Sequence, residues 1–127
     1  MTPEHKTLQS AGADWELQED TVFMPFQQVL VPTGVYLPEM PEDSFIITSP
    51  RSSLFGKFKL IQTNSIGIID SDFENEILTP LLNLSTEPVT VKKGTGMGQL
   101  VATKFLRVFP VKGEKRKGGF GSTDLKN

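Results

Sequence analysis

The sequence predicts a single all-β domain. Glycine and proline together contribute twenty of the 127 residues and are spread along the whole chain, so turn residues recur at short intervals. Short runs rich in β-branched and aromatic residues stand between them, and no twelve-residue window carries the apolar stripe of a helix. Many short strands with frequent turns are typical of a β-sandwich or a barrel-like jelly roll.

The expected strands are runs of β-forming residues bounded by turn residues. In chain order they are Asp14–Leu17, Thr21–Phe26, Gln28–Val31, Gly34–Leu37, Ser44–Ser49, Lys59–Gln62, Ile66–Ile69, Ile77–Leu84, Pro88–Lys92 and Leu100–Val108. The stretch Ser52–Phe58 is the one place where a helical turn or two is expected. Pro80 cannot donate to a ladder, so we expect it at a sheet edge or a bulge.

A change of composition after Phe109 predicts two parts, a β domain over residues 1–109 and a mobile C-terminal arm over residues 110–127. The arm has one aromatic residue, Phe120, among four glycines and five basic residues, so it should not pack as a strand. Fully extended, the residues from Phe109 to Phe120 span roughly 36 Å. The arm could therefore cross its own subunit or reach a neighbour.

The composition excludes several classes of protein. The chain has no cysteine and one histidine, which rules out disulfides and thiolate chemistry and argues against a zinc site. No apolar run approaches the length of a membrane span, and the N-terminus lacks the pattern of a signal peptide. We expect a cytoplasmic protein without a membrane partner.

The net charge of −2 is unevenly distributed. Residues 104–127 hold seven of the thirteen basic residues and two of the fifteen acidic ones. An acidic body with a basic tail suggests that the tail meets an anion, and the alternative is a tail that only aids solubility. Nucleic-acid binding is not expected, because the acidic body would repel a phosphate backbone.

Three carboxylates follow the strand expected at Ile66–Ile69. If the chain stayed extended, Asp70, Asp72 and Glu76 would share one face. Like charges held so close repel, so a metal or a substrate that needs a base is the functional interpretation. The alternative is a polar turn that closes a hairpin.

Glycine-rich and hydroxyl-rich stretches supply candidate anion contacts. In the arm, the glycines of 118–123 can bring N–H groups close to an anion, and Phe120 can stack on a flat ligand; an incidental Phe in an unstructured tail is the alternative. Ser52 and Ser53, after Arg51, can bind phosphate or only cap the helical segment. Together with the carboxylates, these stretches suggest a nucleotide phosphate held near an acid, with a divalent cation, usually Mg²⁺, between them.

In this order the motifs match a known family, and the chain resembles the homotrimeric dUTPases over nearly its whole length. The matching stretches are Ala11–Asp14, Pro50–Leu54, Asn64–Glu76 with its Gly-Ile-Ile-Asp-Ser-Asp core, Gly98–Val101 and Gly118–Thr123. The resemblance implies a jelly-roll-like distorted β-barrel with a flexible arm. It also implies a trimer with three shared sites and a dUTP diphosphatase that uses Mg²⁺ to release dUMP and pyrophosphate.

The resemblance also assigns roles residue by residue. Asp70 matches the general base that activates water for attack on the α-phosphorus. Asn64 and the backbone of Gly67, Ile68 and Ile69 match the hairpin that reads the uracil edge. Phe73 matches the aromatic residue on the deoxyribose, and Leu78 lies among the substrate contacts. The phosphate and lid positions are Arg51, Ser52, Ser53, Gln99, Arg116, Phe120, Gly121, Ser122 and Thr123. No direct protein ligand to the metal is implied, and Asp14 is expected near it through water.

The chain departs from the family pattern in three of these motifs. Phe73 replaces the usual Tyr, Gly96 stands where an Arg is usual, and Lys115-Arg116 replaces the usual Arg-Gly at the start of the last motif. Either Lys115 or Arg116 could take the role of the family arginine. These departures and the short chain lead us to expect a phage or viral source.

Two further functions remain open at this point. A dCTP deaminase shares the fold, and ammonia release from dCTP would identify it. A nucleotide-binding trimer that regulates a partner protein is also physically possible, because a ligand shifts any equilibrium between states that it binds unequally. A biological effect that does not need Asp70 would identify the regulator.

Overall fold

Ten strands and one short helix form within residues 2–113, which are the residues that the computed structural model describes. The strands are β1 (Glu4–His5), β2 (Ala13–Glu16), β3 (Thr21–Phe23), β4 (Gln28–Pro32), β5 (Ser44–Pro50), β6 (Leu60–Gln62), β7 (Gly67–Asp70), β8 (Leu78–Asn83), β9 (Val89–Val91) and β10 (Gly96–Lys104). The helix α1 spans Ser53–Phe58.

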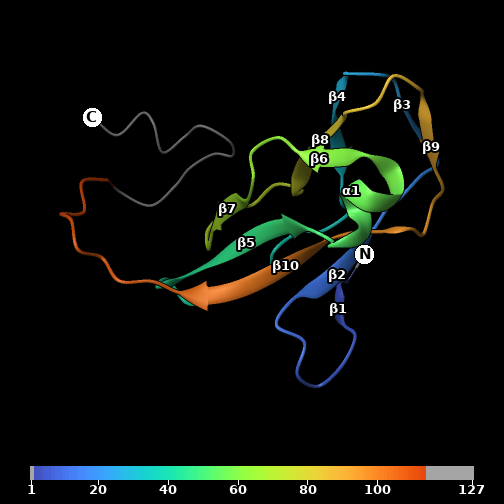
Figure 1. Cartoon of the computed structure of the whole chain (residues 1–127). Helices are drawn as coiled ribbons and strands as arrows, with labels where there is room; N and C mark the ends of the chain where they lie inside the picture. The colour runs from blue at the N-terminus through green and yellow to red at the C-terminus, as the bar shows by residue number, and fades with distance from the viewer. Residues whose placement is uncertain (1, 114–127) are drawn as a thin grey trace.

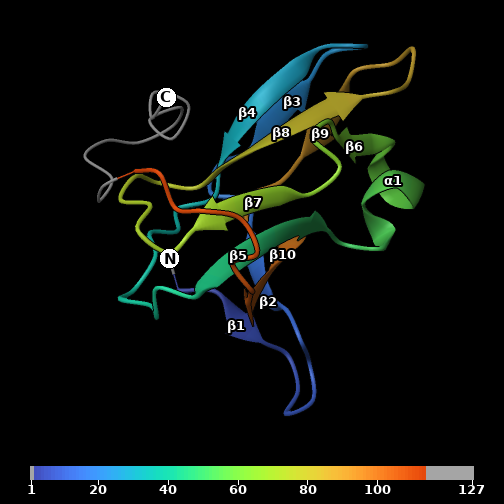
Figure 2. The same cartoon turned by 90° about the vertical axis from the view of Figure 1, so that its left-hand side faces the viewer.

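The strands pair into three antiparallel sheets. A five-stranded sheet has the order β1-β2-β10-β5-β7, a three-stranded sheet has the order β4-β8-β6, and β3 pairs with β9. Figure 1 shows β2, β10, β5 and β7 side by side, and Figure 2 shows β4 and β8 together above β7 and β5. The prediction of an all-β, jelly-roll-like domain is confirmed, although the sheets do not close into one barrel.

The core lies between the sheets because their strands alternate in burial. Along β5, Ser44, Ile46 and Thr48 point inward, and along β8 Thr79, Leu81 and Asn83 do so. Trp15, Phe23 and Ile77 are among the most completely buried large side chains, each no more than 1% exposed. Burying an apolar side chain of this size contributes about 1.5–3 kcal/mol, so this alternation is what holds the sheets together.

The expected strand at Gly34–Leu37 does not form. Gly34 has a φ of +73°, which takes the chain out of the extended conformation, and the segment after Pro32 has no ladder. One strand-like bond survives, because the carbonyl of Val35 accepts the Ile77 N–H at 2.9 Å. The strand expected over Thr21–Phe26 is likewise shorter, since residues 24–27 form a turn in which Phe26 has a φ of 55°.

The last strand begins and ends earlier than the prediction of Leu100–Val108. Strand β10 includes the glycines at 96 and 98, which lie before the predicted start of the strand. A Cβ on Gly98 would lie 2.6 Å from Trp15 Nε1 and 2.8 Å from the Ser49 carbonyl oxygen. Glycine is therefore needed at position 98 for β2 and β5 to approach β10 closely. The short strand β1, which was not predicted, extends the same sheet beyond β2.

Pro80 lies in the middle strand of its sheet, so its predicted edge position is wrong. Strand β8 pairs with β4 on one side and with β6 on the other. The Pro80 carbonyl accepts the Thr63 N–H at 3.1 Å, and Thr63 follows the last residue of β6. Because the N and C=O of a strand residue point to the same side, the missing N–H of Pro80 faces the point where the β6 ladder has ended.

Helix α1 confirms the expected helical turns at Ser52–Phe58. It buries Leu54 and ends at Lys59, whose left-handed backbone lets its N–H bond the Phe55 carbonyl at 2.8 Å. Ser52 occupies the N-cap position but makes no capping bond with its side chain, so its hydroxyl is not used as a cap. Within residues 2–113, no helix is long and apolar enough to cross a membrane.

Candidate active site

The first group of predicted site residues gathers at one end of the five-stranded sheet. In β10, Gln99 is opposite both Asp14 of β2 and Ser49 of β5. Arg51 follows β5 directly, and its backbone N–H donates to the Met97 carbonyl at 3.2 Å. Ser52 and Ser53 come next and are exposed at the start of α1. We call this set, Asp14, Arg51, Ser52, Ser53 and Gln99, the arginine-side group.

The glycine at position 96 explains how Arg51 lies on the sheet. A Cβ on Gly96 would meet the Arg51 guanidinium nitrogen Nη1 and would lie 3.2 Å from Arg51 Cδ. The side chain of Arg51 therefore occupies the space above β10 that a larger residue at 96 would fill. The family pattern that the chain resembles has an arginine where Gly96 stands. Within residues 2–113, this chain therefore has one arginine in that space, Arg51, instead of two.

The second group lies along β7 and the hairpin before it. Gly67 is opposite Thr48 of β5, and Asp70, the last residue of β7, is opposite Phe45. Ile69 is buried, whereas Ile68 and Asp70 are exposed on the other face of the strand. Asn64 is exposed in the turn between β6 and β7. We call this set, Asn64, Gly67, Ile68, Ile69, Asp70 and Phe73, the aspartate-side group.

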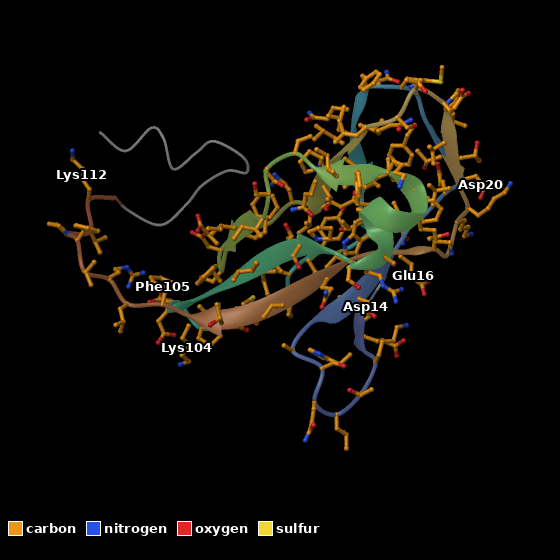
Figure 3. All side chains as sticks on the ribbon, viewed as in Figure 1. Asp14, Glu16, Asp20, Lys104, Phe105 and Lys112 are labelled. Carbon is orange, nitrogen blue, oxygen red and sulfur yellow. The ribbon has the colours of Figure 1, made fainter. Side chains whose placement is uncertain are left out.

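The strand register separates Asp70 from Arg51 within one chain, whereas Gly67 of the same group is opposite Thr48, three residues before Arg51. Asp70 is opposite Phe45, and Arg51 is six residues further along the chain that forms β5. Six residues of strand span roughly 20 Å. Figure 3 shows Asp14, a member of the arginine-side group, well apart from Phe105. The Phe105 ring contacts the ring of Phe45, the residue opposite Asp70. The backbone of the candidate base, Asp70, therefore lies roughly 20 Å along the sheet from that of Arg51 in one chain.

The three carboxylates after β7 do not share a face, so the extended arrangement considered for them does not occur. The chain turns after Asp70, and the Phe73 N–H donates to the Asp70 carbonyl at 3.1 Å. Glu76 instead accepts the backbone N–H of Gly34 at 2.8 Å through Oε2. Glu76 therefore has a structural bond to the loop after β4. The stretch does turn after Asp70, but it closes no hairpin, because β7 and β8 belong to different sheets.

Two other predicted contacts have less accessible positions. Phe73 is 6% exposed and belongs to the hydrophobic core, so little of its ring is available to a ligand in this arrangement. Leu78 is half-buried on the outer face of β8, opposite Pro32 of β4. Arg116, Phe120, Gly121, Ser122 and Thr123 lie outside the described residues, and so does Lys115.

Two polar residues beneath the Asn64 turn were not singled out in the sequence. Thr48 and Gln62 are both buried, and the Gln62 side chain donates to the Thr48 carbonyl at 3.1 Å. The available signal was their alternation with apolar residues, since Ile46 precedes Thr48 by two positions and Leu60 precedes Gln62 by two. A polar residue in register with core residues marks an internal hydrogen bond.

A carboxylate with a lowered pKa, that of Asp20, lies away from both groups. The pKa of Asp20 is lowered, first because its carboxylate accepts the Lys93 N–H at 2.8 Å and then because the Lys92 ammonium lies 3.6 Å away. The stability that follows is present above the ordinary carboxyl pKa and is lost as the pH falls through the lowered value. Asp20 joins the β2–β3 loop to the β9–β10 loop, and Figure 3 shows it well apart from Asp14.

Comparison with solved structures defines the class of protein first. The chain has a TM-score of 0.79 and 30% identity to the dUTPase of Streptococcus mutans, covering 85% of this chain and 88% of that one. A mutant of the dUTPase from Staphylococcus aureus phage phi11, a protein that coordinates a structural Mg(II) ion, has a TM-score of 0.78 at 18% identity, covering 91% and 90% of the two chains. The fold is therefore the jelly-roll fold of dUTPases.

The sequence comparisons then identify the family. The family model described as dUTPase matches residues 1–124. The deoxyuridine 5'-triphosphate nucleotidohydrolase of Neisseria meningitidis serogroup A is 37% identical over 133 residues, which cover 98% of this chain and 89% of that protein. The chain belongs to the dUTPase family, and it is an enzyme of the dUTP diphosphatase class. The predicted family resemblance is confirmed, and the expected phage source stays a prediction.

Proposed function

We propose that this enzyme hydrolyses dUTP to dUMP and pyrophosphate at sites that are shared between copies of the chain, with Asp70 as the general base. The observation that carries this proposal is the extent of the family match, which runs from residue 1 to 124 and so includes every motif named above. The exposed position of Asp70 at the end of β7 supports its role, because a base must reach a water molecule beside the substrate.

The proposed chemistry is a single displacement. Asp70 accepts a proton from water, the water oxygen bonds the α-phosphorus, and the bond from that phosphorus to the bridging oxygen breaks to release pyrophosphate. Arg51, Ser52, Ser53 and Gln99 bind the phosphates through charge-assisted and hydroxyl hydrogen bonds. Asn64 and the backbone of 67–69 bind the uracil edge. Leu78 lies on the sugar side, and Phe73 supports that side from the hydrophobic core. The arm residues Arg116, Phe120, Gly121, Ser122 and Thr123 close over the nucleotide.

The separation of Asp70 from Arg51 within one chain supports a homotrimer with shared sites. A base roughly 20 Å along the sheet from Arg51 is poorly placed to act on the same dUTP molecule within one chain. A second copy that brought its β7 beside the first copy's Arg51 would complete the site. Closed rings of identical subunits use such heterologous contacts, so three copies would form three equal sites.

The outer face of the β4-β8-β6 sheet offers a surface for this association. Cross-strand pairing places Leu30 opposite Pro80, and Pro32 opposite Leu78. On the other side, Ile61 of β6 is opposite Leu82. Leu30 is 57% exposed, and none of these residues is charged. A contiguous apolar face of this kind favours burial against another protein surface, here a second copy of the chain.

The test of this function is pyrophosphate release with Mg²⁺ from dUTP, dCTP, dTTP and UTP at equal concentrations. We expect fast release from dUTP alone, because the hairpin reads the base edge and the sugar side leaves no room for a 2′-hydroxyl. Ammonia from dCTP would indicate the deaminase instead. Tight dUTP binding without release from any nucleotide would favour the regulatory trimer.

Mg²⁺ is proposed as the cofactor, held chiefly by the substrate. Within residues 2–113, no group of three or more His, Asp or Glu side chains could hold a metal ion. The half-buried Asp14, beside Gln99, fits an ion that arrives on the triphosphate and meets the protein through water. Such an ion supplies positive charge that offsets the phosphates, while Arg51 binds them directly.

Removing Mg²⁺ should weaken binding of the non-hydrolysable analogue α,β-imido-dUTP by about tenfold or more, because phosphate oxygens prefer a hard cation. Calorimetry with and without EDTA measures this. Asp14→Asn should raise the Mg²⁺ concentration needed for half-maximal binding. Glu19→Gln is the control, because Glu19 is an exposed carboxylate that follows β2, and it should leave that concentration unchanged. Equal Mg²⁺ dependence in both variants would remove Asp14 from the site.

A further inference from the structure

Two buried polar side chains beneath the Asn64 turn have no part in the chemistry proposed above. Thr48 is 4% exposed in β5, and Gln62 is 7% exposed at the end of β6. Both occupy core-facing positions in strands whose other inward residues include Ile46 and Leu60. Burying a hydroxyl and an amide costs free energy unless they are hydrogen-bonded, so an apolar pair would be the simpler choice for packing alone.

Thr48 receives hydrogen bonds from both ends of the turn. Gln62 Nε2 donates to the Thr48 carbonyl at 3.1 Å and to its hydroxyl oxygen Oγ1 at 3.3 Å. The backbone N–H of Gly67 donates to the same Oγ1 at 3.0 Å. Gln62 precedes the turn of residues 63–66 and Gly67 follows it. One hydroxyl therefore ties the two strands that carry the turn to a third strand, β5.

The same contacts set the position of Asn64. The turn is closed by the Ser65 N–H, which donates to the Gln62 carbonyl at 3.1 Å, and Ser65 has a φ of 63°. A Cβ on Gly67 would meet Thr48 Oγ1 and would lie 3.4 Å from Asn64 Nδ2. Gly67 is therefore packed between the Thr48 hydroxyl and the Asn64 amide. Any shift of Thr48 or Gly67 would move the amide above them.

We propose that Thr48 and Gln62 are positioning residues that determine how strictly the enzyme selects uracil. This inference rests on the proposed function, in which Asn64 and the backbone of 67–69 contact the base edge. Neither Thr48 nor Gln62 touches the nucleotide. They hold the hydrogen-bond donors and acceptors of the turn in one geometry. Discrimination between uracil and cytosine requires that fixed geometry, because a mobile turn can adjust to the edge of cytosine.

The experiment compares Thr48→Val, Thr48→Ser and Thr79→Val as intact enzymes. Thr48→Val keeps the shape but removes the acceptor, leaving the Gly67 N–H without it. We expect about a tenfold rise in KM for dUTP and in the dissociation constant of α,β-imido-dUTP, the size expected for one buried hydrogen bond. The preference for dUTP over dCTP should fall by a similar factor, while kcat for dUTP stays within about twofold.

The two other variants separate positioning from simple packing. Thr48→Ser retains the hydroxyl and should restore the wild-type KM and base preference. Thr79→Val is a matched control, because Thr79 is 2% exposed in β8 and its Oγ1 has no hydrogen-bond partner within residues 2–113. It should change neither quantity. A lower melting temperature in Thr48→Val, with wild-type KM and base preference, would overturn the proposal.

A second variant covers the case in which Thr48→Val does not fold. Gln62→Met keeps the side-chain length and leaves the bond between Thr48 and Gly67, so a reduced dUTP preference supports the proposal and an unchanged preference overturns it. The wild-type enzyme is measured first. Equal turnover of dUTP and dCTP by the wild type would refute the proposed function, whereas wild-type selectivity retained in the folded variants would refute only the positioning role.

Discussion

Replacing Asp70 with asparagine is expected to lower kcat for dUTP by about 10³-fold, in the range that a general base contributes. The asparagine side chain would keep the size of the aspartate and could still orient a water molecule, but it could not accept the proton. Binding of α,β-imido-dUTP should remain within about threefold of wild type, because the phosphates and the base are held by other residues. Stopped-flow pyrophosphate release and calorimetry measure the two effects separately.

Glu74→Gln is the control for this result. Glu74 is exposed in the segment after β7, so the substitution removes a negative charge four residues away. We expect turnover within about twofold of wild type, as for most exposed substitutions that leave the site intact. Wild-type turnover in Asp70→Asn would refute the assignment of the base. An equal loss in both variants would point to the net charge of the turn and not to a base at residue 70.

Mixing two inactive variants is expected to restore activity if the sites are shared. Arg51→Ala lacks a phosphate contact and Asp70→Asn lacks the base, so each variant alone should be nearly inactive. In a mixed trimer, a site that takes Arg51 from one chain and Asp70 from the next is intact when the first chain is the Asp70→Asn variant and the second is the Arg51→Ala variant. Random mixing of equal amounts makes about a quarter of such sites complete.

The measurement is turnover after the two variants have been unfolded together and refolded, compared with each variant treated alone. The separation of Arg51 and Asp70 along β5 is the reason to expect recovery. A mixture that is no more active than its components, with trimers present by sedimentation, would mean that both residues act within one chain. Co-refolding Asp70→Asn with a double variant that lacks both residues is the matched control and should recover nothing.

The sequence determined the fold class and most of the strands through local patterns. Turn residues at short intervals and β-branched runs between them are properties of the chain itself, and they predicted β2, β5, β7 and β9 to within one or two residues. The failures have causes outside the local sequence. A positive φ at Gly34 ended one expected strand, and at Gly98 the close contact with Trp15 required a glycine inside a strand. Contacts with distant residues decide such positions, so a local pattern cannot predict them.

The candidate residues were also found from the sequence, since motif order indicates the family without any geometry. Only the tertiary structure decided how these residues are distributed. Strand register placed Asp70 opposite Phe45 and Gly67 opposite Thr48, and these pairings join segments 19 or more residues apart in the chain. It also gave Glu76 a bond to Gly34 and placed Phe73 in the core. Hydrogen bonds and packing between distant strands determine where these side chains lie. The sequence alone suggested that Asp70, Asp72 and Glu76 share one face, because it does not contain these contacts.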